Sequence, residues 1–130
     1  MPEKIDIYKT PDEIDTSDLK LEQGRCFRNA LRVANKYPPV EIVEGIIVYV
    51  SLRNTAKIIR HVWNKMNGKH FDVTVDKIFY GTEEMKDSKE IKYVVVKMHN
   101  AKDFKDGDVF EFCEETNNTV SEMNDILNKN

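Results

Sequence analysis

The sequence has few of the residues that brace a small fold covalently, and no segment that would anchor it in a membrane. Its 130 residues include two cysteines, four prolines and five glycines. Cys26 and Cys113 are too few for a disulfide framework, and the longest apolar run, residues 46–50, is far too short to span a bilayer. The N-terminus lacks a basic segment followed by an apolar run, the pattern of a secretion signal. These absences predict a cytoplasmic protein with reduced thiols and no membrane partner.

Charged residues are abundant but unevenly distributed. They make up 33% of the chain, beside 40% hydrophobic residues, an ordinary balance for one globular domain over residues 1–130. The net charge of −3 argues against a nucleic-acid partner, yet residues 24–77 carry a net +6 and all five arginines. A locally positive field favours a thiolate and attracts acidic substrates. The alternative is a solvated helix face with scattered surface arginines.

The pattern of apolar residues predicts an α+β fold, with a helix packed on an antiparallel β-sheet of four to five strands and a second, C-terminal helix. The first helix is expected from residue 26 to Tyr37, because proline disfavours helical geometry in the residue before it. Strands are expected over residues 40–52 with a bend or bulge at Gly45, 58–65, 69–75, 91–98 and 109–113, with a short edge strand over 5–8. Residues 83–90 are expected to form a polar loop or short helical turn. A capping box at Thr119 predicts the start of the last helix.

One turn gives a sharper prediction. Asn67-Gly68 is a strong hairpin signal, because both positions of a type I′ turn need positive φ. Met66 then pairs with Lys69, and His61 becomes a diagonal neighbour of Asp72, about 7–8 Å away between backbones. The residues expected to share one face of this hairpin are His61, Trp63, Lys65, His70, Asp72 and Thr74.

Cys26 is placed where a thiol becomes reactive. At a helix start, unpaired backbone N–H groups and the positive end of the dipole stabilise a thiolate. Gly24 before it permits a tight entry into the helix. His61 can accept the thiol proton and Asp72 can orient that imidazole, while the Cys26 N–H and Gln23 are candidates for binding an oxyanion. The trio therefore predicts nucleophilic catalysis.

Four motifs together resemble a known family. Gly24-x-Cys26-x-x-x-Ala30, Val43-Glu44-Gly45, His61-x-Trp63 and Asp72-x-Thr74 are similar to the core of the transglutaminase-like superfamily, within the papain-like cysteine enzymes. The resemblance covers about residues 24–75. It implies a nucleophile at Cys26, a general base at His61 and its orienting partner at Asp72.

The same resemblance implies cysteine-dependent acyl transfer or hydrolysis of an amide or peptide bond, on a protein or peptide substrate and without a metal or organic cofactor. Gln23, Gly24 and Trp63 are the expected substrate contacts, with Trp63 shielding the site or lining its entrance. One alternative is an inactive relative that uses this fold as a protein-interaction module. Another is a zinc site drawn from Cys26, His61, His70 and Asp72.

Overall fold

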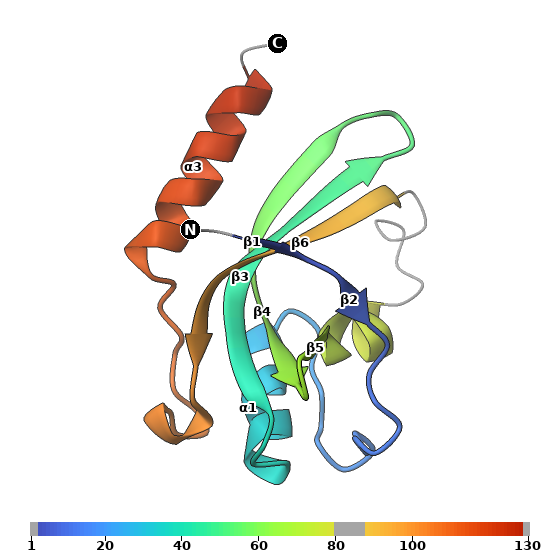
Figure 1. Cartoon of the computed structure of the whole chain (residues 1–130), viewed down its shortest axis with the longest axis vertical. Coiled ribbons are helices and arrows are strands. Elements are labelled where there is room, and N and C mark those ends of the chain that lie inside the picture. Colours follow the sequence, from blue (N-terminus) through green and yellow to red (C-terminus); the bar gives the residue numbers. More distant parts are fainter. Residues whose placement is uncertain (1–2, 80–87, 129–130) are drawn as a thin grey trace.

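The chain folds as a curled β-sheet with helices on its outer face (Figure 1). This computed structural model describes residues 3–79 and 88–128, so the loop expected at 83–90 lies mainly outside the described residues. In chain order the elements are β1 (Glu3–Ile5), β2 (Ile7–Tyr8), α1 (Cys26–Lys36), β3 (Glu41–Ser51), β4 (Ala56–Met66), β5 (Lys69–Phe71), η1 (Thr74–Phe79), β6 (Ser88–His99), η2 (Ala101–Asp103) and α3 (Glu114–Asn128). None of the described helices has the length and apolar character needed to cross a bilayer.

The N-terminal strand closes the sheet. The order of the six described strands is β1-β6-β3-β4-β5-β2, so β1 and β2, separated only by Asp6, pair with opposite edges. The prediction of a wholly antiparallel sheet of four to five strands is therefore wrong, since β2 runs parallel to β5. The reason is the curl of the sheet, which brings its two edges close together. The consecutive segments β1 and β2 can therefore pair with β6 at one edge and with β5 at the other. The result is a small barrel-like sheet.

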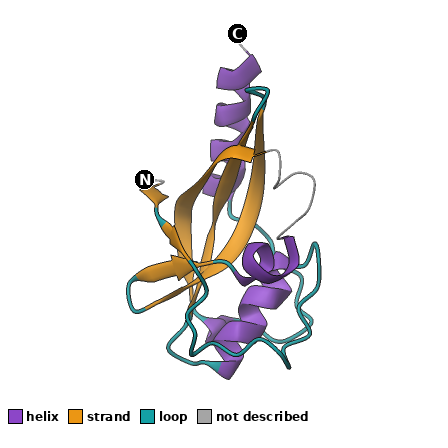
Figure 2. Ribbon diagram, turned by 90° about the vertical axis from the view of Figure 1, so that its right-hand side faces the viewer, coloured by secondary structure: helices purple, strands orange, loops and turns teal. Residues whose placement is uncertain are grey.

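The two faces of the sheet bury different side chains. Ile42 and Val62 point outward and pack with the apolar face of α1. Val43, Trp63 and Tyr93 point inward and form the core of the curled sheet. Figure 2 shows α1 and α3 at opposite ends of the sheet. The predicted helix start at Cys26 is confirmed, as is the irregularity at Gly45, where the pairing of β3 with β6 shifts register.

The strand expected over residues 69–75 is much shorter. The Asn67-Gly68 turn forms as predicted, with φ of 54° and 79°, and Met66 pairs with Lys69. However, β5 ends at Phe71, and η1 follows. The cause is Asp72, whose Oδ1 accepts the backbone N–H of Val75 at 3.2 Å, the bond of a helix N-cap.

Two predictions for the C-terminal region are also wrong. Residues 109–113 form no strand, because the exposed edge of β6 is already paired with β1. Phe110 instead stacks on Phe27 of α1, with ring centroids 4.7 Å apart. Helix α3 begins at Glu114 rather than near Thr119, because a carboxylate from another strand caps it. Cys113, expected inside a strand, is the residue just before this helix.

That carboxylate belongs to Glu44, which is 0% exposed. Its Oε2 accepts the backbone N–H of Cys113 at 2.8 Å and the hydroxyl of Thr116 at 2.5 Å. Its Oε1 lies 2.8 Å from Nε2 of His99. A buried carboxylate is stable only when its oxygens are paired. Glu44 therefore fixes the start of α3 against β3 and the end of β6.

Replacing Glu44 with Ala should lower the free energy of unfolding by about 3 kcal/mol, because three donors, of which Thr116 is fully buried, lose their acceptor. Urea denaturation at pH 7, followed by circular dichroism, measures this. Glu41→Ala, exposed on the same strand, is the matched control and should cost less than about 0.5 kcal/mol. A loss from Glu44→Ala as small as that of the control would contradict the role given to Glu44.

The stability that Glu44 contributes should depend on pH. Burial would raise the pKa of Glu44, but hydrogen bonds with Thr116, His99 and Cys113 hold the pKa below its ordinary value of 4.5. A depressed pKa in the folded state contributes stability that is present above 4.5 and is lost as the pH falls below it. The stability difference between the wild type and Glu44→Ala should therefore shrink in acid.

Candidate functional site

Asp72 and His61 meet inside the curled sheet, as the hairpin register predicted. His61 Nε2 lies 2.8 Å from Asp72 Oδ2, and both side chains are buried. Asp72 thus has two functions: one carboxylate oxygen caps η1 and the other holds the imidazole of His61. Thr74 does not join this face, because the chain has already turned into η1.

Tyr93 is a member of the site that the sequence did not predict. Its hydroxyl donates a hydrogen bond of 2.8 Å to the same Asp72 oxygen that holds His61. Burial raises the pKa of Tyr93, and the charge and hydrogen bond of Asp72 raise it further. The phenol therefore stays protonated and keeps donating. No local signal marks Tyr93, which reaches Asp72 from β6 across the sheet.

The early end of β5 opens the edge of β4 beside His61. Strand β5 pairs with β4 only from Asn64 to Met66. Met66 and Lys69 close the two-residue turn and form a hydrogen-bonded pair, so the Met66 N–H points toward β5. Every second residue of a strand points its N–H to the same side, so the Val62 N–H also points to the side of β5. No described strand covers that side at Val62. The edge is thus accessible from the outer layer, where α1 lies.

Cys26 occupies this open edge. Its thiol lies beside the His61 side chain and the Val62 backbone, and both of them lower the pKa of the thiol. Because Nε2 of His61 is bonded to Asp72, the nitrogen left for the thiol is Nδ1. The three residues predicted as a triad are therefore brought together in the order thiol, imidazole, carboxylate.

The electrostatics of the trio favour an ionised pair. Burial would raise the pKa of the Cys26 thiol, but the hydrogen bond and charge of His61, together with Val62, bring it below the ordinary value of 9.0. Burial also opposes protonation of His61, yet the charge and hydrogen bond of Asp72 raise its pKa to about 10. Both shifts favour the proton on His61 and the thiolate form of Cys26.

Asn29 holds the loop that leads into α1. Its side-chain amide accepts the Glu22 N–H and donates to the Glu22 carbonyl, both at 2.9 Å. It also donates to Thr74 Oγ1 at 3.0 Å, which ties the loop to the segment after Asp72. Asn29 is fully buried, although its side chain is polar. Its burial could not be foreseen, because η1 covers that side of α1.

Gln23 and Gly24 lie in this loop and are exposed beside Cys26. Gly24 has a φ of +76°, and nothing lies within 4 Å of the position of a Cβ, so the backbone conformation rather than space requires glycine. Arg25, the residue before α1, forms no capping hydrogen bond through its side chain. The first N–H groups of α1 therefore remain available to an oxyanion.

Trp63 lies inside the sheet and not at an entrance. Its side chain is 1% exposed, its ring stacks near that of His61 with centroids 6.2 Å apart, and its Nε1–H donates to His70 Nδ1 at 3.1 Å. A Cβ on Gly45 would lie 2.5 Å from the indole, so this glycine makes room for it. Of the two roles expected for Trp63, this position favours shielding.

Within residues 3–79 and 88–128, no group of three or more His, Cys, Asp or Glu side chains is placed to hold a metal ion. His61 and Asp72 are bonded to each other, and His70 is bonded to Trp63. The zinc alternative therefore has no ligand cluster in the described part of the chain.

Replacing Tyr93 with Phe should cost about 1–2 kcal/mol in the free energy of unfolding, because the buried Asp72 carboxylate loses a donor. Chemical denaturation measures this. Tyr8→Phe, which removes a hydroxyl from an exposed ring, is the matched control and should have little effect. If both variants are equally stable, the Tyr93 hydroxyl does not support Asp72.

Comparison with known proteins finds no matching family model, no similar curated protein and no similar solved structure. The resemblance of the four motifs to the transglutaminase-like superfamily therefore stays a prediction. What the site can do follows from its own geometry: a thiol at a helix start, an imidazole beside it and a buried carboxylate behind the imidazole.

Proposed function

We propose that this protein catalyses cysteine-dependent acyl transfer or amide-bond hydrolysis, with a papain-like, transglutaminase-like core. The observation that carries the proposal is the position of His61, which bonds to the Asp72 carboxylate through Nε2 and interacts with the Cys26 thiol. A structural cysteine needs no such partner, and a structural histidine needs no thiol. The combination matches the needs of an activated nucleophile.

In the first half-reaction, the Cys26 thiolate attacks the carbonyl carbon of a carboxamide or peptide, and a C–S bond forms. The carbonyl oxygen becomes an oxyanion, which the free N–H groups at the start of α1 stabilise. As the C–N bond breaks, His61 gives its Nδ1 proton to the departing amine. The products are a thioester on Cys26 and a free amine.

In the second half-reaction, neutral His61 removes a proton from water or from an acceptor amine, which attacks the thioester carbonyl. The C–S bond breaks and the thiolate of Cys26 is restored, with His61 again protonated. Asp72 stabilises the imidazolium in both half-reactions and fixes the ring so that Nδ1 faces the sulfur. Water gives hydrolysis and an amine gives acyl transfer.

The ionised pair predicts a pH profile for Cys26. The rate of its alkylation by iodoacetamide should rise with a midpoint below 9.0, because the thiolate is stabilised by protonated His61. Asp72→Asn should raise the midpoint by about one pH unit or more, because His61 then holds its proton less firmly. Mass spectrometry of the Cys26 peptide measures the rates.

Asp125→Asn, an equal charge change on the exposed side of α3, is the control and should leave the midpoint unchanged. A wild-type midpoint at or above 9.0 would contradict an ionised pair at Cys26.

The acyl-transfer step can be tested with a generic donor. With p-nitrophenyl acetate, the protein should release a burst of nitrophenolate and carry an S-acetyl group on Cys26. Cys26→Ser should abolish the burst, and His61→Gln should slow it by about 100-fold, the usual range for loss of a general acid–base group. Stopped-flow absorbance and intact-protein mass spectrometry follow the two products.

Cys113→Ser is the matched control, because Cys113 also lies at a helix start but has Thr116 rather than an imidazole beside its sulfur, at 3.4 Å. This variant should keep the full burst. Equal acetylation of the two cysteines, or no burst at all, would refute the enzyme and favour the interaction module.

A further inference from the structure

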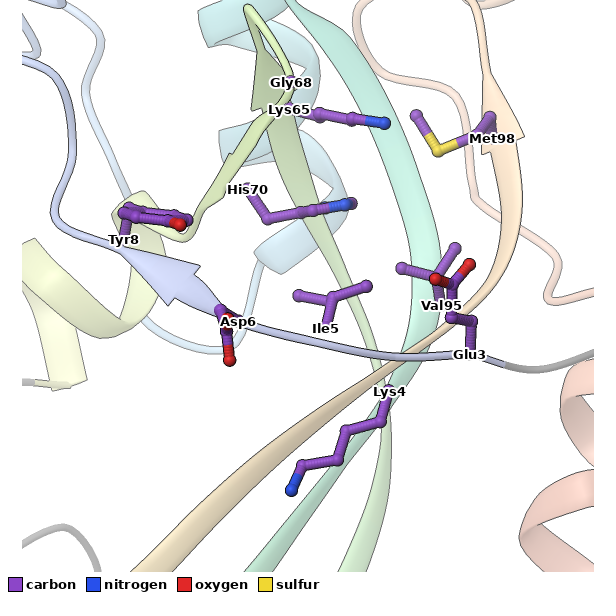
Figure 3. Close-up of a pocket in the computed structure, with 10 residues that line it drawn as sticks. All are labelled: Glu3, Lys4, Ile5, Asp6, Tyr8, Lys65, Gly68, His70, Val95 and Met98. Atoms are coloured by element: carbon purple, nitrogen blue, oxygen red, sulfur yellow. The ribbon is translucent and has the colours of Figure 1, made fainter.

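A second polar site lies away from Cys26. A hollow of about 490 Å³ opens between the N-terminal strand, the β4–β5 hairpin and the end of β6 (Figure 3). This volume is in the range of small-molecule sites. The side chains that matter for its chemistry are Glu3, Lys65 and His70, with Ile5, Val95 and Met98 as the apolar part of the wall.

His70 presents an unused donor to this hollow. The residue is 7% exposed, and its Nδ1 accepts the Trp63 N–H. Burial and the nearby charge of Lys65 lower the pKa of His70, so the ring is neutral and its proton is on Nε2. Among the described residues Nε2 has no hydrogen-bond partner, and Figure 3 shows the ring pointing into the hollow. The Nε2 donor is therefore free to bind an acceptor that enters the hollow.

Two opposite charges face the same space. Lys65 extends across the hollow from β4, and Glu3 reaches it from β1 (Figure 3). Both act on His70 through their charge, in opposite senses. Neither forms an ion pair within 4.0 Å with another described residue, and they do not pair with each other. Lys4 and Asp6 also border the hollow, but Figure 3 shows their side chains pointing to the other side of the N-terminal strand.

We propose that this hollow binds a small zwitterion of the chemical class of a free amino acid. The carboxylate of the ligand accepts hydrogen bonds from Lys65 Nζ and His70 Nε2, and its ammonium pairs with Glu3. An apolar ligand side chain packs on the three apolar residues of the wall. This site does not depend on the catalytic role of Cys26, and the two can be tested separately.

The chain contains one tryptophan, Trp63, which provides a specific signal. Its indole N–H donates to His70, so a ligand on the other nitrogen of His70 should shift the indole peak in a ¹H–¹⁵N spectrum of the full chain. L-leucine should cause a saturable shift. N-acetylleucine lacks the ammonium and leucinamide lacks the carboxylate, so each should bind at least about tenfold more weakly.

Variants of Lys65 and Glu3 test which residue binds each end of the ligand. Lys65→Gln should weaken leucine binding at least about tenfold, whereas Lys102→Gln, the same change on an exposed turn, should not affect it. Glu3→Gln should weaken leucine binding but not the residual binding of N-acetylleucine. No saturable shift with leucine, or equal shifts with all three compounds, would overturn the proposal. N-acetylleucine binding more tightly than leucine would also overturn it.

Discussion

The buried carboxylate of Asp72 is the interaction on which the candidate site depends. One oxygen caps η1 through the Val75 N–H, and the other holds both His61 and the Tyr93 hydroxyl. A carboxylate removed from water must keep such partners, since losing one costs a large part of the stability of a small domain. The helical turn after β5, the middle of β4 and the middle of β6 are therefore positioned relative to one another by a single side chain.

The cap formed by Asp72 also explains how residues from two layers meet. His61 points into the curled sheet, whereas α1 covers its outside. Continued pairing of β5 past Phe71 would place a strand between Cys26 and His61. Because Asp72 turns the chain into η1 instead, the edge of β4 stays open, and the thiol reaches both the imidazole and the Val62 backbone. The shortened strand is thus a condition for the reactive pair.

The chain contains a second cysteine at a helix start, Cys113, and its surroundings differ from those of Cys26. Cys26 is the first residue of α1, and Cys113 directly precedes α3, where its N–H binds a buried carboxylate that also holds a histidine. There one oxygen of the Glu44 carboxylate accepts the Cys113 N–H and the Thr116 hydroxyl, and the other holds His99. Its negative charge occupies the place that would stabilise a thiolate. At Cys26 the histidine lies between sulfur and carboxylate, so the two cysteines differ in the order of the three groups.

The sequence by itself determined the features that depend on neighbouring residues: the helix start at Cys26, the Asn67-Gly68 turn, and with that turn the pairing of His61 with Asp72. The N-cap at Asp72 is also a local feature, but the alternation of apolar and polar side chains over residues 69–75 favoured a continued strand. Only the tertiary structure decided that one N-terminal strand closes both edges of the sheet, that Tyr93 joins the site and that Glu44 starts α3. Those outcomes depend on which segments the curl of the sheet brings together. The spacing of residues along the chain does not predict which distant segments come into contact.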